Sequence, residues 1–161
     1  MPDTELYKTI YEVAKVINLS LRPREVMQRI AEQVTNALQS KGCFIRVLDK
    51  SGSLLLPDAY YGLSDRYAEK GPVEVAKSQL DQEVLKGNML VISDVRTDPP
   101  FQYPKQAEEE GLVSLLVLPL SVAGERIIGS IRVYSDAVRE FSDDEKAFMT
   151  CVANLAGLAL E

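Results

Sequence analysis

The stretch from residue 115 to residue 134 constrains the fold of this chain more than any other. Two apolar segments, Leu115–Val122 and Ile127–Tyr134, flank a short link at residues 123–126 that contains a glycine. Apolar, β-branched runs of this length predict strands, and so short a link predicts that they pair as an antiparallel hairpin. Pro119 has no backbone N–H donor, so we expect a local distortion in the first strand.

A second strand pair is predicted earlier in the chain. Residues 43–48 alternate between two faces, which places Phe44 and Arg46 on the same face. A polar turn follows, and residues 54–61 then predict a partner strand. Pro57 lies within that partner strand, which favours a sheet edge or a bulge at this position.

Helices are predicted at both ends of the chain. Residues 4–20 carry an apolar stripe at helical spacing, and Pro23 suits the first turn of a second helix that ends before Gly42. Ser142 followed by Glu145 is a capping-box pattern and predicts the start of the last helix. This last helix is apolar nearly all round, so it has to be covered on more than one side.

The whole chain is interpreted as one α+β domain with its terminal helices together on one face of the sheet. The predicted parts are the N-terminal helices at 1–40, the sheet at 42–134 with an irregular insertion at 62–113, and the C-terminal helix at 142–161. Within the insertion, we expect short helices at 64–70, 78–86 and 105–110 and a brief strand at 89–92.

Composition excludes several classes of function. The chain has no histidine, which removes the commonest general base, haem ligand and zinc ligand together. Its net charge of -6 would repel a nucleic-acid backbone, so no nucleic-acid binding is expected. No apolar run approaches the ~20 residues that span a bilayer, and the start lacks the features of a secretory signal. We therefore expect a cytoplasmic protein that does not enter the membrane.

The order of these elements, together with several local phrases, resembles the GAF domain family over nearly the whole chain. The phrases are Gly42-Cys43-Phe44-Ile45-Arg46-Val47-Leu48-Asp49, Tyr61-Gly62-Leu63-Ser64, Ile92-Ser93-Asp94-Val95, Val117-Leu118-Pro119-Leu120, Ile128-Gly129 and Phe141-Ser142-Asp143-Asp144-Glu145. The resemblance implies a six-stranded antiparallel sheet whose first and last strands are neighbours. It also implies terminal helices behind the sheet and, in front, a ligand pocket that the insertion roofs.

The resemblance also bears on which ligand the domain binds. Relatives that bind cyclic nucleotides carry an Asn-Lys pair after the last strand, with Phe and Asp-Glu beyond it. Phe141, Asp144 and Glu145 are similar to the latter, but Tyr134-Ser135-Asp136 stands where the Asn-Lys pair is expected. Haem-binding relatives use histidine, and bilin-binding relatives use a cysteine in the insertion with a histidine nearby. Cys43 and Cys151 lie outside the insertion, and they do not resemble the cysteine cluster of the methionine-sulfoxide-reducing relatives. No cofactor is expected.

Arg46 and Arg132 are the leading candidates for ligand contacts. If the strands that carry them are neighbours, both guanidinium groups can point into one pocket, where their fork geometry suits a carboxylate, phosphate or other oxyanion. We therefore expect a small anionic ligand. The alternative is that both arginines pair with internal carboxylates, for which Asp94 and Asp98 in the insertion are candidates.

Other side chains complete the predicted site. These ligand-binding candidates are aromatic, namely Phe44, Tyr60, Tyr67, Tyr103 and Tyr134; a tyrosine that packs with its hydroxyl at the surface is the alternative for each. A buried thiol such as Cys43 should react poorly. No metal site is expected.

The predicted function is a non-catalytic sensor module in signal transduction that reports through its terminal helices to an output domain or signalling partner. The terminal helices also favour a homodimer, because the last helix still continues at Glu161. A dimerisation module without a ligand and a thiol-based reductase are the alternatives.

Overall fold

The computed structural model describes residues 3–19, 22–96, 104–122 and 126–160. Its elements follow one another as α1 (Asp3–Asn18), α2 (Pro23–Ala37), β1 (Gly42–Leu48), β2 (Leu54–Tyr61), α3 (Asp65–Ala68), β3 (Val73–Glu74), a 3-10 turn (Val75–Lys77), α4 (Gln79–Leu85), β4 (Leu90–Ile92), α5 (Pro104–Glu110), β5 (Ser114–Val122), β6 (Arg126–Ser135) and α6 (Asp143–Leu160). The predicted α+β order is confirmed. The two-residue strand β3 was not predicted.

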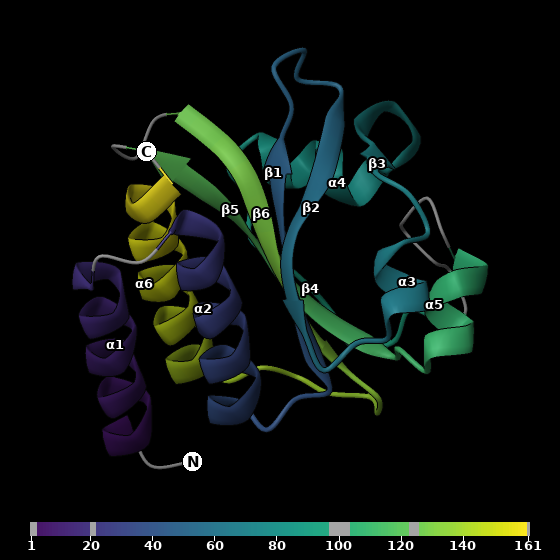
Figure 1. The fold of residues 1–161 in the computed structure, drawn as a ribbon. Helices are drawn as coiled ribbons and strands as arrows, with labels where there is room; N and C mark the ends of the chain where they lie inside the picture. The colour runs from purple at the N-terminus through teal and green to yellow at the C-terminus, as the bar shows by residue number, and fades with distance from the viewer. Residues whose placement is uncertain (1–2, 20–21, 97–103, 123–125, 161) are drawn as a thin grey trace.

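The strands form one antiparallel sheet of six strands in the order β3-β2-β1-β6-β5-β4. The first and last long strands, β1 and β6, are therefore neighbours in the middle of the sheet, as predicted (Figure 1). Their close approach depends on Gly129, since a Cβ there would lie 2.1 Å from the carbonyl oxygen of Arg46. The β5–β6 hairpin is also antiparallel, as predicted.

Both strand prolines lie near irregular pairing. The register between β1 and β2 shifts between Ile45 and Arg46, and Arg46 pairs with Pro57. Of the two predicted alternatives at Pro57, a sheet edge or a bulge, the pairing shows the bulge. Pro119 pairs in register with Ser130, and the shift in β5 occurs just beyond it, between Leu120 and Ser121. The described pairing of β4 with β5 covers residues 115–117, so it stops short of this proline.

The terminal helices lie together behind the sheet, as predicted. Helices α2 and α6 pack directly against it, and α1 covers both of them from outside (Figure 1). This arrangement explains why α6 is apolar nearly all round, because it contacts β5, α1 and α2. Helix α6 approaches β5 so closely that a Cβ on Gly157 would lie 2.2 Å from the carbonyl oxygen of Ser121.

The predicted capping box is formed at the start of α6. The Ser142 hydroxyl accepts a hydrogen bond from the Glu145 N–H at 3.1 Å, and the Glu145 carboxylate accepts one from the Ser142 N–H at 2.9 Å. Within the described residues, none of the helices combines the length and the apolar character that crossing a bilayer requires.

Candidate functional site

The candidate site lies on the front face of the sheet, under the insertion. In the register of β1 and β6, Phe44 stands opposite Arg132 and Arg46 opposite Ser130. Alternation along each strand therefore turns both guanidinium groups toward the same side. Both side chains are buried, with exposed fractions of 0% for Arg46 and 2% for Arg132. The sequence correctly indicated that the two arginines share one face of the sheet.

These arginines lie within an apolar layer between the sheet and the insertion. The layer brings together residues of the insertion and of the sheet, namely Phe44, Leu63, Tyr67, Ala68, Leu80, Val84, Val95, Ala107, Leu112, Leu115, Val117 and Tyr134. We call this layer the front core. A charge buried among such side chains is costly unless it has a partner of opposite charge.

Arg132 has such a partner in Asp81 of α4. Its Nη2 donates to Asp81 Oδ2 at 2.5 Å, and Ser78 Oγ donates to the same oxygen at 2.6 Å. Burial alone would raise the pKa of the Asp81 carboxyl, but Arg132 and these hydrogen bonds outweigh it and hold the pKa below its ordinary value. Asp81 is therefore ionised at neutral pH and balances one of the two guanidinium charges.

Arg46 is in a different position. None of its three side-chain nitrogens has a hydrogen-bond partner in the described part of the chain, although all of them are buried. Its guanidinium group lies over the ring of Phe44, 3.7 Å from the ring centroid. The hydroxyl of Ser130, opposite Arg46 in the register, is also buried and has no partner in that part of the chain. A face-on aromatic ring supplies some attraction for a cation but accepts no strong hydrogen bond.

Three of the predicted tyrosines are part of this region. Tyr67 and Tyr134 are buried with their hydroxyl groups 3.3 Å apart, and Arg132 Nη1 lies 3.4 Å from the Tyr134 hydroxyl. The rings of Phe44 and Tyr67 meet edge to face, with centroids 6.3 Å apart. Tyr60 stacks on Phe44 from β2, and its hydroxyl donates to the Asp65 carboxylate, which raises the pKa of the phenol to about 12.

Of the two insertion carboxylates named as candidate partners, the structure describes only Asp94. Asp94 lies apart from both arginines in the described contacts, and its carboxylate instead binds Arg96 with an Nη2–Oδ2 distance of 2.9 Å. Asp98 and Tyr103 lie outside the described residues. The internal carboxylate at Arg132 is Asp81, which the sequence analysis missed. Its signal was an acidic residue three positions after the helix-capping Ser78, on the helix face that also carries Leu80 and Val84.

Lys70, just after α3, was also missed. Its Nζ lies 3.8 Å from the centroid of the Tyr67 ring and 5.2 Å from that of Phe44, and it donates to the Tyr67 carbonyl oxygen at 3.3 Å. Burial, followed by the charges of Arg46 and Arg132, lowers the pKa of this amine to about 6. A lysine next to a Gly-Pro turn has no sequence signal for this environment.

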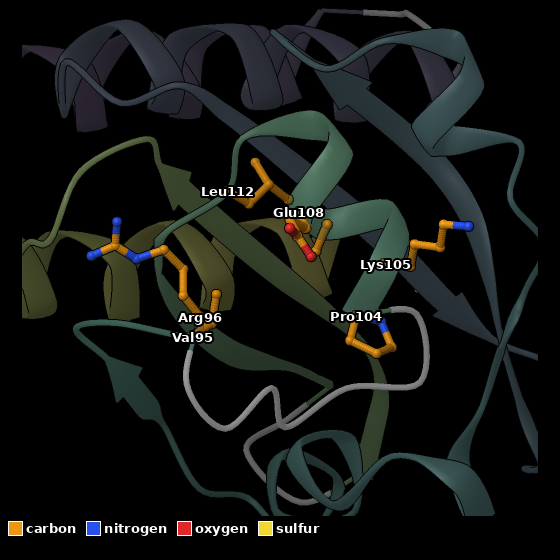
Figure 2. A pocket seen from close by; sticks show the side chains of 7 residues that line it. Val95, Arg96, Pro104, Lys105, Glu108 and Leu112 are labelled. Carbon is orange, nitrogen blue, oxygen red and sulfur yellow. The ribbon is translucent and has the colours of Figure 1, made fainter.

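A cavity of about 410 Å³ opens beside the front core, between the end of β4 and α5. It is lined by three members of the front core, Val95, Ala107 and Leu112, and by Arg96, Pro104, Lys105 and Glu108. Figure 2 shows Arg96 and Lys105 on opposite sides of this space. A ligand that entered here would next meet the apolar layer that covers the two arginines.

The two cysteines lie behind the sheet, away from this site. Cys43 belongs to the apolar core that α2 and α6 cover, and burial raises the pKa of its thiol. Cys151 lines a groove between α1 and α6. Among the described residues, no group of three histidine, cysteine, aspartate or glutamate side chains could hold a metal ion.

Comparisons with known proteins agree with this architecture. The sequence model of the GAF domain family matches residues 20–161. The chain is 28% identical to the Nif-specific regulatory protein of Azorhizobium caulinodans over 156 residues, which cover 92% of this chain and 25% of that protein. The chain thus spans about a quarter of the length of the curated relatives it matches.

Solved structures share the fold. The GAF domain of a phosphoenolpyruvate-protein phosphotransferase from Coxiella burnetii superposes with a TM-score of 0.87 at 15% identity, covering 99% of this chain and 95% of that one. A domain of a protein named as a putative two-component sensor histidine kinase protein from Sinorhizobium meliloti gives a TM-score of 0.72 at 23% identity, covering 88% of this chain and 92% of that one. With a family match over most of its length and a shared fold, the chain belongs to the GAF domain family.

Proposed function

We propose that this GAF domain is a non-catalytic regulatory sensor that binds a small anion through Arg46 and Arg132. The observation that carries the proposal is Arg46, a fully buried cation whose three nitrogens lack hydrogen-bond acceptors in the described residues. An anion beside it would supply acceptors in the fork geometry that guanidinium prefers. Asp81 already balances Arg132, so the described arginine pair keeps one excess positive charge.

Binding at this position requires the insertion to move, because the front core covers both arginines. The strands that hold the two arginines also contact the core on the other side of the sheet, so a shift of these strands on ligand binding would reach the terminal helices. In β1, Phe44 and Arg46 alternate with Cys43 and Ile45, which pack in the core under α2 and α6. A ligand that favours one position of these strands would therefore favour one arrangement of the terminal helices.

The regulatory role draws support from the relatives. The curated proteins that match are named as Nif-specific regulatory proteins and are about four times as long as the matched segment. We infer that the domain works beside an output domain in a longer regulator. A thiol-based reductase is disfavoured by Cys43, whose buried thiol is a poor nucleophile.

The test is anion binding measured by calorimetry and by thermal unfolding, with nitrate, phosphate and sulfate as probes. We expect wild-type protein to be stabilised, since a ligand at 100 times its Kd adds about 2.7 kcal/mol. Arg46→Met should abolish the effect, whereas Lys77→Gln, at an exposed position in an ion pair with Glu74, serves as the charge-matched control. Equal stabilisation of wild-type and Arg46→Met protein by every anion would contradict the proposal.

Dimerisation is a second candidate function, and α1 carries the observation that favours it. Tyr7 and Tyr11 are 70% and 64% exposed on this helix. Beside Tyr7 runs a groove of about 230 Å³ between α1 and α6, with Leu6, Ile10 and Phe148 in its walls. Two aromatic side chains on one helix face suit a second copy of the chain. Sedimentation analysis of wild-type and Tyr7→Lys protein tests this, because the substitution should shift a dimer toward monomer.

A further inference from the structure

Lys70 brings a third basic group to the region around Arg46. Its Nζ lies 5.2 Å from the centroid of the Phe44 ring, and the guanidinium carbon of Arg46 lies 3.7 Å from the same centroid. The Arg46 guanidinium and the Lys70 amine therefore border one aromatic ring. Lys70 is only partly buried, whereas Arg46 is fully buried. We infer that Lys70 completes the anion site and that the favoured ligand is a dianion, whose binding protonates this amine.

Within the described residues, charged groups from four elements surround Lys70. Arg46 of β1 and Arg132 of β6 disfavour its protonated form, whereas Asp81 of α4 and Glu110 of α5 favour it. Tyr67 of α3 contributes its ring face and its carbonyl oxygen. Burial and the two guanidinium groups outweigh the carboxylates and lower the pKa of the amine to about 6, so it is largely neutral at pH 7.5 in the ligand-free protein.

The charge of the ligand then decides the state of Lys70. A monoanion at Arg46 offsets one positive charge and so removes much of the repulsion between the guanidinium groups and the protonated Lys70 amine. A dianion leaves a further negative charge beside the amine, which favours the ammonium form and places a proton donor next to the ligand. Since the affinity and the protonation are linked, a dianion should bind with uptake of one proton at pH 7.5. This inference rests on the proposed anion site and adds the charge of the ligand that the site favours.

The chain offers an unusually clean test of this linkage, because it contains no histidine. Sulfate is a dianion and nitrate a monoanion throughout the range from pH 6.5 to 8.5, so neither probe titrates. We expect the affinity for sulfate to fall by up to about tenfold per pH unit across this range, and the affinity for nitrate to fall less. Calorimetry in buffers of different ionisation enthalpy should show uptake of about one proton per sulfate at pH 7.5.

Variants of Lys70 separate its titration from its packing. Lys70→Arg keeps a permanent charge, so it should bind sulfate with little dependence on pH. Lys70→Gln should bind sulfate weakly at every pH and without proton uptake. Lys77→Gln is the matched control, since Lys77 is 63% exposed in an ion pair with Glu74 and should leave the pH profile unchanged.

The outcomes distinguish this inference from the proposed function. Sulfate binding that needs Arg46 but keeps its pH slope in Lys70→Gln overturns the role of Lys70 and leaves the anion site intact. An amine of Lys70 that titrates near pH 10.5 in ligand-free protein, followed by NMR of its ε-carbon, overturns it as well. If no probe binds in a manner that depends on Arg46, the proposed function and this inference both fail.

Discussion

The two faces of the sheet bury side chains of different kinds. Behind the sheet, α2 and α6 cover a core that is apolar throughout its described members, from Met27 and Ile30 to Ile131 and Val152. In front, the insertion covers a layer in which Arg46, Arg132 and Asp81 are buried among aromatic and aliphatic residues. Every buried charged side chain in the described part of the chain lies on the front. Burial of apolar side chains behind the sheet therefore stabilises the fold, whereas burial of charged side chains in front is unfavourable for stability. Buried charges of this kind are common at functional sites.

Removing a back-core side chain should produce the largest loss of stability. Ile30 is fully buried in α2, so Ile30→Ala leaves a cavity and should lower the free energy of unfolding by about 4 kcal/mol. Urea denaturation measures this. Leu158→Ala, at a position that is 60% exposed on α6, should change it by no more than about 0.5 kcal/mol. A small effect at Ile30 would show that the back core is looser than its packing indicates.

On the front, the ion pair offers the next largest effect. Asp81→Asn keeps the shape of the side chain but removes the charge that pairs with Arg132, and it should cost about 3 kcal/mol. Because the pKa of Asp81 is lowered in the folded protein, this contribution is present above its unfolded value and is lost as the pH falls through the folded value. The difference between wild type and variant should thus shrink below about pH 4. An equal difference at pH 3 and pH 7 would argue against the pair.

The protonation of Lys70 should make stability depend on pH near neutrality. Its pKa is about 6 in the folded protein and 10.5 ordinarily, so between these values the unfolded chain binds a proton that the native state lacks. The free energy of unfolding should therefore rise with pH above 6, by up to about 1 kcal/mol per unit. Urea denaturation at pH 6, 7.5 and 9 tests this. Lys70→Met should flatten the rise, while Lys77→Met should preserve it.

Replacing Arg46 should change stability least. Arg46→Met puts an apolar side chain of similar length where a buried cation had no hydrogen-bond acceptor in the described residues. The free energy of unfolding should change by less than about 1 kcal/mol, and an increase is expected. A loss of 3 kcal/mol would show that Arg46 stabilises the fold, and its assignment as a ligand-binding residue would then fail.

Much of the fold follows from local patterns. The β5–β6 hairpin and the capping box at Ser142 each depend on neighbouring residues, and each was predicted. The bulge beside Pro57 was one of the two alternatives predicted there. Tyr7 and Tyr11 show the limit of such patterns, since they flank the apolar stripe of α1 yet remain exposed, whereas Val16 is buried. Helical spacing indicates one face of a helix, but the neighbouring elements decide how wide the covered stripe is.

In the candidate site, too, local patterns predicted some features and not others. Period-two alternation was enough to place Phe44 and Arg46 on one face of β1, and the family resemblance implied that β6 lies beside it. Asp81 and Lys70 reach the arginines from parts of the insertion whose position relative to the sheet no local pattern specifies. Asp94, one of the two carboxylates named as candidate partners, binds the nearby Arg96 instead.

The sequence by itself determined the order and type of the long elements, the side of each strand on which the arginines lie, and the absence of histidine chemistry. Tertiary structure alone decided what each of the buried basic and acidic side chains contacts. Asp81 pairs with Arg132, Arg46 lies against Phe44, and Lys70 borders the same ring. The reason is physical. Side-chain direction follows from backbone periods of two and 3.6 residues, but charge pairing and burial depend on distances across the fold, which sequence spacing does not encode.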